Sequence, residues 1–95
     1  MKAEAKVKVP NASGLHARPA AIFVETASSF DSEIEIKNLS ILSEWMDAKS
    51  ILSLLALGVE QNHQVMIRAE GEDAQKAVDT LVNLVLNDLV KYDES

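Results

Sequence analysis

The sequence predicts an α+β fold, an open-faced sandwich in which a four-stranded antiparallel sheet carries three helices on one face, in the order β-α-β-β-α-β-α. Three observations support this prediction. Apolar and charged residues alternate with a period of two in three short segments. Other segments repeat apolar residues at the helical spacing of three and four. Proline, glycine and other turn-forming residues separate these segments.

The first half of the chain predicts two strands with a helix between them. Residues 3–9 alternate small apolar with charged side chains, which is typical of a strand with one face in water. The turn formers of residues 10–14 end this strand. From residue 19 to about 29, apolar residues recur at i, i+3, i+4 and i+7, and Pro19 suits the first turn of that helix. Residues 32–37 alternate again and predict the second strand.

The second half predicts two further strands and two helices. Residues 38–47 fit neither period cleanly, and a third strand is expected there. A short helix is predicted over 49–58 because its apolar run ends at a glycine. Residues 64–70 alternate as the fourth strand, and the acidic residues in the turn at 71–73 are expected to cap the next helix. An inward apolar stripe then runs along the longest helix, over 74–89.

Length and composition favour one small soluble domain covering residues 1–95. The chain has no cysteine, which excludes disulfides, thiol nucleophiles and thiolate metal sites. The N-terminus lacks the apolar region of a signal peptide, and the longest uncharged apolar stretch, 51–59, is too short to span a bilayer. A cytoplasmic protein without membrane insertion is therefore expected. The formal net charge of −6 argues against a nucleic-acid partner.

One segment carries the residues for chemistry. Residues 14–20, Gly-Leu-His-Ala-Arg-Pro-Ala, place His16 at the junction of a loop and a helix, with Arg18 two residues further on. A helix N-terminus offers unpaired N–H groups and the positive end of the helix dipole, both of which favour a bound anion. A neutral imidazole is a good nucleophile, and a guanidinium presents a planar fork of donors to phosphoryl oxygens. From spacing alone, the alternative of a simple helix cap at His16 and a solvated Arg18 stays open.

This segment closely resembles the active-site signature of the HPr family, the histidine-containing phosphocarriers of the bacterial sugar phosphotransferase system. The resemblance continues at residues 49–51, 57–59 and 69–73, and so covers nearly the whole chain. It implies that His16 accepts a phosphoryl group from Enzyme I and donates it to the IIA domains of sugar permeases. It further implies a monomeric carrier that turns over only with partner enzymes and is not an enzyme itself, without cofactor or metal.

The resemblance also assigns roles to the neighbours of His16. It implies that Arg18 and the backbone N–H of Ala17 stabilise the phosphoryl group, and Ser13 stands where the family often has a hydroxyl or amide beside the site. Ser50 resembles the family's regulatory serine, the target of an HPr kinase/phosphorylase. From the residues alone, Ser50 is a helix cap like many mid-chain serines.

Two of the predicted helices carry more apolar residues than their inward faces can bury. The excess residues would flank His16 in the family's fold, which suggests a shared surface for partner proteins. The excess residues are Ile22, Ile51, Leu52 and Leu55, and together with the adjacent Ala21 and Lys49 we call them the docking patch.

The remaining aromatic and histidine residues have plain interpretations. Phe23 and Phe30 are expected in the core, and Trp45 and Met46 in core or edge packing. His63 lies in the turn before the fourth strand without a ligand-spaced partner, so it is expected at the surface and no metal is predicted.

Three other functions are alternatives to the sugar carrier. A carrier in a nitrogen-related or regulatory phosphotransfer chain remains the main alternative, because the sequence does not distinguish it. An interaction module that has lost transfer is disfavoured because His16 and Arg18 are both present. A self-contained enzyme is disfavoured because a lone histidine has no partnered base, metal ligands or nucleotide loop.

Overall fold

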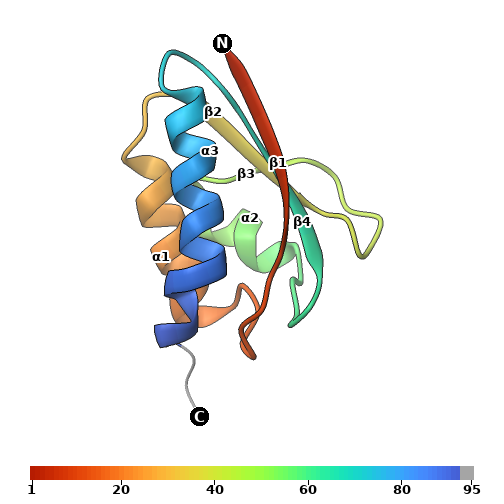
Figure 1. Cartoon of the computed structure of the whole chain (residues 1–95). Coiled ribbons are helices and arrows are strands. Elements are labelled where there is room, and N and C mark those ends of the chain that lie inside the picture. The colour runs from red at the N-terminus through yellow and green to blue at the C-terminus, as the bar shows by residue number, and fades with distance from the viewer. Residues whose placement is uncertain (93–95) are drawn as a thin grey trace.

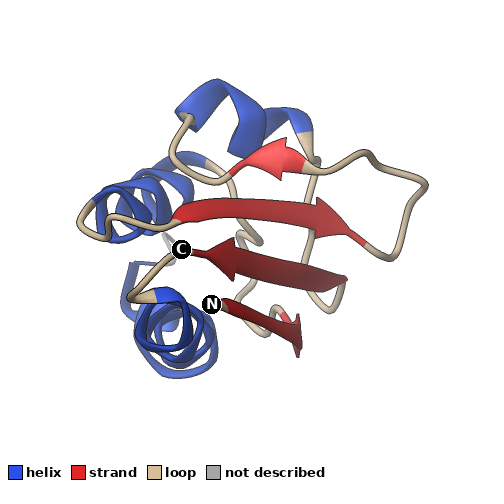
Figure 2. Ribbon diagram, turned by 90° about the horizontal axis from the view of Figure 1, so that it is seen from above, coloured by secondary structure: helices blue, strands red, loops and turns tan. Residues whose placement is uncertain are grey.

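A computed structural model describes residues 1–92 and contains one four-stranded antiparallel sheet in the order β1-β4-β2-β3. The strands are β1 (Lys2–Lys8), β2 (Glu33–Asn38), β3 (Met46–Asp47) and β4 (Gln64–Glu70). Figure 2 shows β1 and β3 at opposite edges, with β4 and β2 between them. The first, second and fourth strands therefore lie within a residue or so of the segments that alternation predicts.

Three helices lie on one side of this sheet, which confirms the predicted open-faced sandwich (Figure 1). They are α1 (Ala17–Ser28), α2 (Ile51–Ala56) and α3 (Ala74–Asn83). Helix α3 packs on β1 and β4, whereas α1 contacts both α2 and α3. The chain continues from α3 through a π-helical turn, η1 (Leu84–Asp88), into a 3-10 turn, η2 (Leu89–Tyr92).

The core lies between the sheet and the helices, and the inward-facing residues of the alternating strands form its sheet side. In β4, Val65, Ile67 and Ala69 are buried, while the residues between them are exposed or half-buried. Register places Ile67 between Ala5 of β1 and Ile36 of β2, so the apolar side chains of neighbouring strands share one face. The largest side chains buried from the helices and loops are Leu15, Phe23, Leu54, Leu57, Leu81 and Leu89.

The predicted third strand is mostly wrong. Only Met46 and Asp47 pair with β2, and residues 39–42 form a turn. The reason is local: the Asn38 side chain accepts a hydrogen bond from the Ser40 N–H at 2.9 Å, and the Asn38 N–H donates to the Ser43 hydroxyl at 2.8 Å. These bonds satisfy the backbone without a ladder, which is how Asn and Ser compete with sheet pairing.

The last predicted helix is regular only to Asn83, yet its inward stripe continues through the irregular turns. Leu81, Val85 and Leu89 are all buried. The apolar pattern thus predicted which residues are buried. It did not predict the change from α-helix to π-helical and 3-10 turns. Among residues 1–92, no helix is both long and apolar enough to cross a membrane.

The expected acidic cap of α3 is also wrong. Asp73 occupies the N-cap position but its carboxylate makes no cap bond. It accepts hydrogen bonds from the N–H groups of Asp31 and Ser32, at 2.9 and 3.0 Å, and from the Ser32 hydroxyl. The Ser32 hydroxyl, followed by the Asp31 N–H, lowers the pKa of Asp73 from its ordinary value. Asp73 therefore joins the β4–α3 turn to the α1–β2 turn, at the end of the fold away from residue 16 (Figure 1).

Candidate functional site

His16 is the N-cap residue of α1, with extended backbone angles and no side-chain cap bond to the helix. Its imidazole keeps 38% of its surface exposed. The ring is therefore accessible from solvent, at the end of a helix whose first N–H groups have no partners within that helix. The position of His16 at the start of a helix was expected from the sequence.

A tight turn before His16 depends on Asn11 and Gly14. The buried Asn11 amide donates to the Gly14 carbonyl at 2.7 Å, and the Gly14 N–H donates to the Asn11 carbonyl at 3.0 Å. Gly14 has φ 58°, and a Cβ at this position would lie 2.1 Å from the Val59 carbonyl oxygen. The next N–H, that of Leu15, donates to that same carbonyl at 3.0 Å. Glycine is thus required because two backbone segments touch here.

This contact brings a carboxylate to His16 that sequence reasoning missed. Glu60 Oε2 lies 3.0 Å from His16 Nε2, although the two residues are 44 positions apart. Figure 1 shows the two segments, residues 10–16 and the connection from α2 to β4, at the same end of the domain. No local motif links them. The only sequence signal was an acidic residue shortly after a helix-ending glycine.

His63 was expected to be a plain surface histidine, but it makes hydrogen bonds that hold a turn together. It is half-buried, and its Nδ1 lies 3.1 Å from both the Glu60 backbone N and the Asn38 side-chain nitrogen. The Asn38 amide also donates to the Leu57 carbonyl at 3.1 Å. Because an N–H group of Glu60 points at it, Nδ1 of His63 acts as an acceptor. His63 therefore closes the turn that carries Glu60.

Ala17 and Arg18 are placed differently from each other. Ala17 has φ 49°, a left-handed conformation that costs a non-glycine residue about 1 to 2 kcal/mol and that turns the chain from the loop into α1. Arg18 is exposed, and its guanidinium carbon lies 5.5 Å from the centroid of the Tyr92 ring. The cation is therefore stacked on the last described turn of the chain. Ser13, in the turn before His16, is half-buried.

Ser50 is the N-cap of α2, and its hydroxyl accepts the Ser53 N–H at 3.3 Å. The interpretation of Ser50 as a helix cap is therefore correct. Its neighbour Lys49 donates from Nζ to the Phe30 carbonyl at 2.7 Å, which ties the start of α2 to the end of α1. Lys49, expected at a partner surface, thus makes an intramolecular bond. Phe30 itself is only half-buried against the core.

The docking patch is exposed on α2 and less so on α1. Leu52 is 76% exposed, and Ile51 and Leu55 are exposed as well. Ala21 is exposed on α1, but Ile22 is half-buried and packs against the core, so its expected outward position is only partly correct. Helices α1 and α2, which carry these residues, contact each other.

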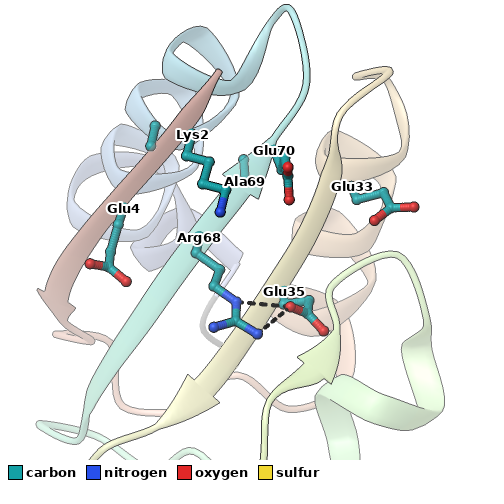
Figure 3. Close-up of a pocket in the computed structure, with 8 residues that line it drawn as sticks. Lys2, Glu4, Glu33, Glu35, Arg68, Ala69 and Glu70 are labelled. Carbon is teal, nitrogen blue, oxygen red and sulfur yellow. Dashed lines mark hydrogen bonds and ion pairs between the residues drawn. The ribbon is translucent and has the colours of Figure 1, made fainter.

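The helix-free face of the sheet has a hollow that does not include any predicted site residue. Figure 3 shows Arg68 at its centre, bound to Glu35 with an Nε–Oε1 distance of 2.8 Å. Beside it, the half-buried Trp45 ring stacks on the Arg68 guanidinium at 3.8 Å and on Lys37 at 4.9 Å, so Trp45 covers the open face rather than the core. The hollow is lined by Lys2, Ala3, Glu4, Glu33, Glu35, Arg68, Ala69 and Glu70.

Comparison with known proteins gives the family. A family model described as "PTS HPr component phosphorylation site" matches residues 3–87. The phosphocarrier protein HPr of Haloferax volcanii is 39% identical over 82 residues, which are 86% of this chain and 91% of that protein. The crystal structure of HPr-C-His from Thermoanaerobacter tengcongensis superposes with a TM-score of 0.85 at 39% identity, covering 98% of this chain and 99% of that one.

Longer proteins also contain a similar region. The multiphosphoryl transfer protein of Haemophilus influenzae is 43% identical over 81 residues, which are 85% of this chain but 16% of the relative. The chain thus spans about a sixth to a fifth of the length of the multiphosphoryl transfer proteins that it matches. With the family match, the fold and an accessible histidine at the start of α1, the chain belongs to the HPr family, the phosphocarriers of the phosphotransferase system.

Proposed function

We propose that residues 1–95 form one carrier domain that accepts a phosphoryl group from Enzyme I on His16 and donates it to IIA domains of sugar permeases. The observation that carries this proposal is the half-exposed imidazole of His16 at the start of α1, inside the region matched by the family model. A surface site without a deep cleft suits a carrier, because phosphoryl transfer needs positioning and charge stabilisation that a docked partner can complete.

The groups around His16 supply that stabilisation in part. The backbone N–H groups of Ala17 and Arg18 lie in the first turn of α1, where the helix dipole favours a dianion. The Arg18 guanidinium, which lies over the Tyr92 ring, belongs to the same turn and carries the planar N–H donors that bind phosphoryl oxygens. Ser13, in the preceding turn, is a candidate further donor from its hydroxyl.

The direct experiment is to incubate the protein with Enzyme I and phosphoenolpyruvate and to map acid-labile phosphate by mass spectrometry. The chain has two histidines, 16 and 63, so peptide mapping distinguishes them. Phosphate on His16 supports the proposal. Absence of labelling, or labelling confined to His63, contradicts it.

We further propose that the docking patch binds these partners and that Ser50 regulates them. A phosphate on the Ser50 hydroxyl would replace the acceptor of the Ser53 N–H and put about two negative charges beside Ile51 and Leu52. The cost of desolvating these charges would then oppose docking of an apolar partner surface. A Ser50→Asp variant tests this, because it should slow transfer from Enzyme I without removing the His16 nucleophile, whereas an unchanged rate speaks against regulation.

A further inference from the structure

The Glu60 carboxylate contacts one of the two ring nitrogens of His16. Its Oε2 lies 3.0 Å from His16 Nε2. An ionised carboxylate can only accept hydrogen bonds, so in this contact Nε2 is the donor. In the neutral imidazole the lone pair is then on Nδ1, the other ring nitrogen. The contact therefore selects a tautomer as well as a ring orientation.

The backbone of Glu60 is held from three sides. Its N–H points at Nδ1 of His63 and its carbonyl accepts the His63 N–H, each at 3.1 Å. The same turn is bonded to Val9, the residue that follows β1. The Asn62 N–H donates to the Val9 carbonyl at 2.7 Å, and the Val9 N–H donates to the His63 carbonyl at 2.9 Å. A Cβ on Gly14 would lie 2.9 Å from Glu60 Cα, so the two segments are in direct contact.

We propose that Glu60 is a positioning residue for phosphoryl transfer at His16, an inference that rests on the proposed carrier function. The Nδ1 lone pair forms the new N–P bond, while the bond from phosphorus to the donor's leaving atom breaks and its electron pair leaves with the donor. The proton stays on Nε2, so the ring becomes positively charged. The Glu60 carboxylate stabilises that charge and keeps Nδ1 directed away from itself.

The size of the effect follows from exposure. The Glu60 side chain is 64% exposed, and water screens such a pair. An exposed ion pair of this kind changes a rate constant by about fivefold at most. We therefore expect phosphoryl acceptance by Glu60→Ala to be slower by about threefold to fivefold, and not abolished.

The experiment compares wild type, Glu60→Ala and the control Glu72→Ala. Glu72 is an exposed glutamate in the β4–α3 turn, at the opposite end of the domain, so its removal changes net charge equally (Figure 1). Two quantities are measured: the rate of phosphorylation of His16 by Enzyme I and the ring ¹⁵N chemical shifts of His16 at about pH 8.5, where an ordinary histidine is neutral. Circular dichroism checks that each variant is folded.

In wild type and Glu72→Ala we expect two well-separated ring ¹⁵N shifts, with the protonated nitrogen at Nε2, and equal transfer rates. In Glu60→Ala the two shifts should move toward each other as the second tautomer becomes populated, and transfer should slow. If either the shifts or the rate stay as in wild type, the inference is wrong while the proposed function stands. If wild type takes no phosphoryl group on His16, the proposed function fails instead.

Discussion

Two helices of this protein both begin after a residue with extended backbone angles, but the two residues use this position differently. His16 precedes α1 with φ −114° and ψ 162°, and Ser50 precedes α2 with φ −115° and ψ 120°. Ser50 turns its hydroxyl inward and accepts the Ser53 N–H, whereas His16 makes no cap bond and turns its ring to Glu60 and solvent. One helix start is stabilised by its own side chain, and the other leaves its N–H groups available to an anion.

The difference shows how a small domain can remain folded although the start of α1 lacks a stabilising cap. The start of α1 lacks a cap and contains Ala17 in a left-handed conformation, both of which cost stability. Compensation comes from tertiary contacts: Leu15 is fully buried, and its N–H donates to the Val59 carbonyl. The site is thus held by the segment that follows α2 rather than by its own helix.

The strongest test of the comparison is His16→Ala. We expect it to abolish phosphoryl acceptance from Enzyme I because the nucleophile is lost, while the free energy of unfolding changes by about 0.5 kcal/mol or less, as is usual at an exposed site. Acid-labile labelling and urea unfolding measure the two quantities. Retained labelling of this variant would refute the assignment of His16.

Gly14→Ala tests the tertiary support of the α1 start. The added methyl group would collide with the Val59 carbonyl, and φ 58° disfavours alanine, so we expect a loss of more than about 2 kcal/mol in the free energy of unfolding. Urea unfolding provides the measurement. The matched control is Gly58→Ala, because Gly58 has φ 59° but open space around its Cβ position, and it should lose less.

Leu52→Ser tests whether the exposed part of α2 serves partners. We expect binding of Enzyme I to weaken by about 1 to 2 kcal/mol, the size of a modest interface hot spot, with little change in stability. Leu42→Ser is the control, since Leu42 is fully exposed in the turn after β2. Calorimetric titration should separate the two variants, and equal affinities would argue against the docking patch.

Ser50→Ala should cost about 1 kcal/mol of stability, because the Ser53 N–H loses its acceptor at the start of α2. In contrast to His16→Ala, it should leave phosphoryl acceptance near the wild-type rate. Denaturant unfolding combined with the transfer assay checks both. A Ser50→Ala variant with unchanged stability and impaired transfer would contradict the comparison, in which Ser50 stabilises its helix and His16 accepts the phosphoryl group.

The smallest expected effect concerns Asp73, the third helix-start residue, which bonds to Asp31 and Ser32 instead of capping α3. Its pKa is lowered from 3.8 in the folded protein, so its contribution to stability is present above pH 3.8 and is lost as the pH falls through the lower folded value. Asp73→Asn should therefore destabilise the protein at neutral pH and less so in acid. Urea unfolding of wild type and variant at neutral pH and in acid, with Glu72→Gln as control, tests this. If the loss in the free energy of unfolding is the same at neutral and acid pH, ionisation of Asp73 is not the cause.

The sequence by itself determined the periodic elements, the core and the position of His16. Alternation over 64–70 predicted β4 with its correct ends, and the stripe from Ala74 to Leu89 predicted burial even where the helix changes type, because apolar periodicity reflects the core directly. Gly14 and Pro19 marked the loop-to-helix junction because glycine suits a turn with positive φ and proline suits the first turn of a helix.

Tertiary structure alone decided the rest. The carboxylate of Glu60 reaches His16 only because two distant segments touch at Gly14, and Asp73 bonds to Ser32 because two turns meet at the other end of the fold. Residues 39–42 form a turn instead of the predicted strand because the side chains of Asn38 and Ser43 accept hydrogen bonds from backbone N–H groups. Hydrophobic periodicity indicates which residues face the core. Contacts between polar groups far apart in the chain produce no periodic pattern in the sequence, because they depend on where the folded backbone brings those groups together.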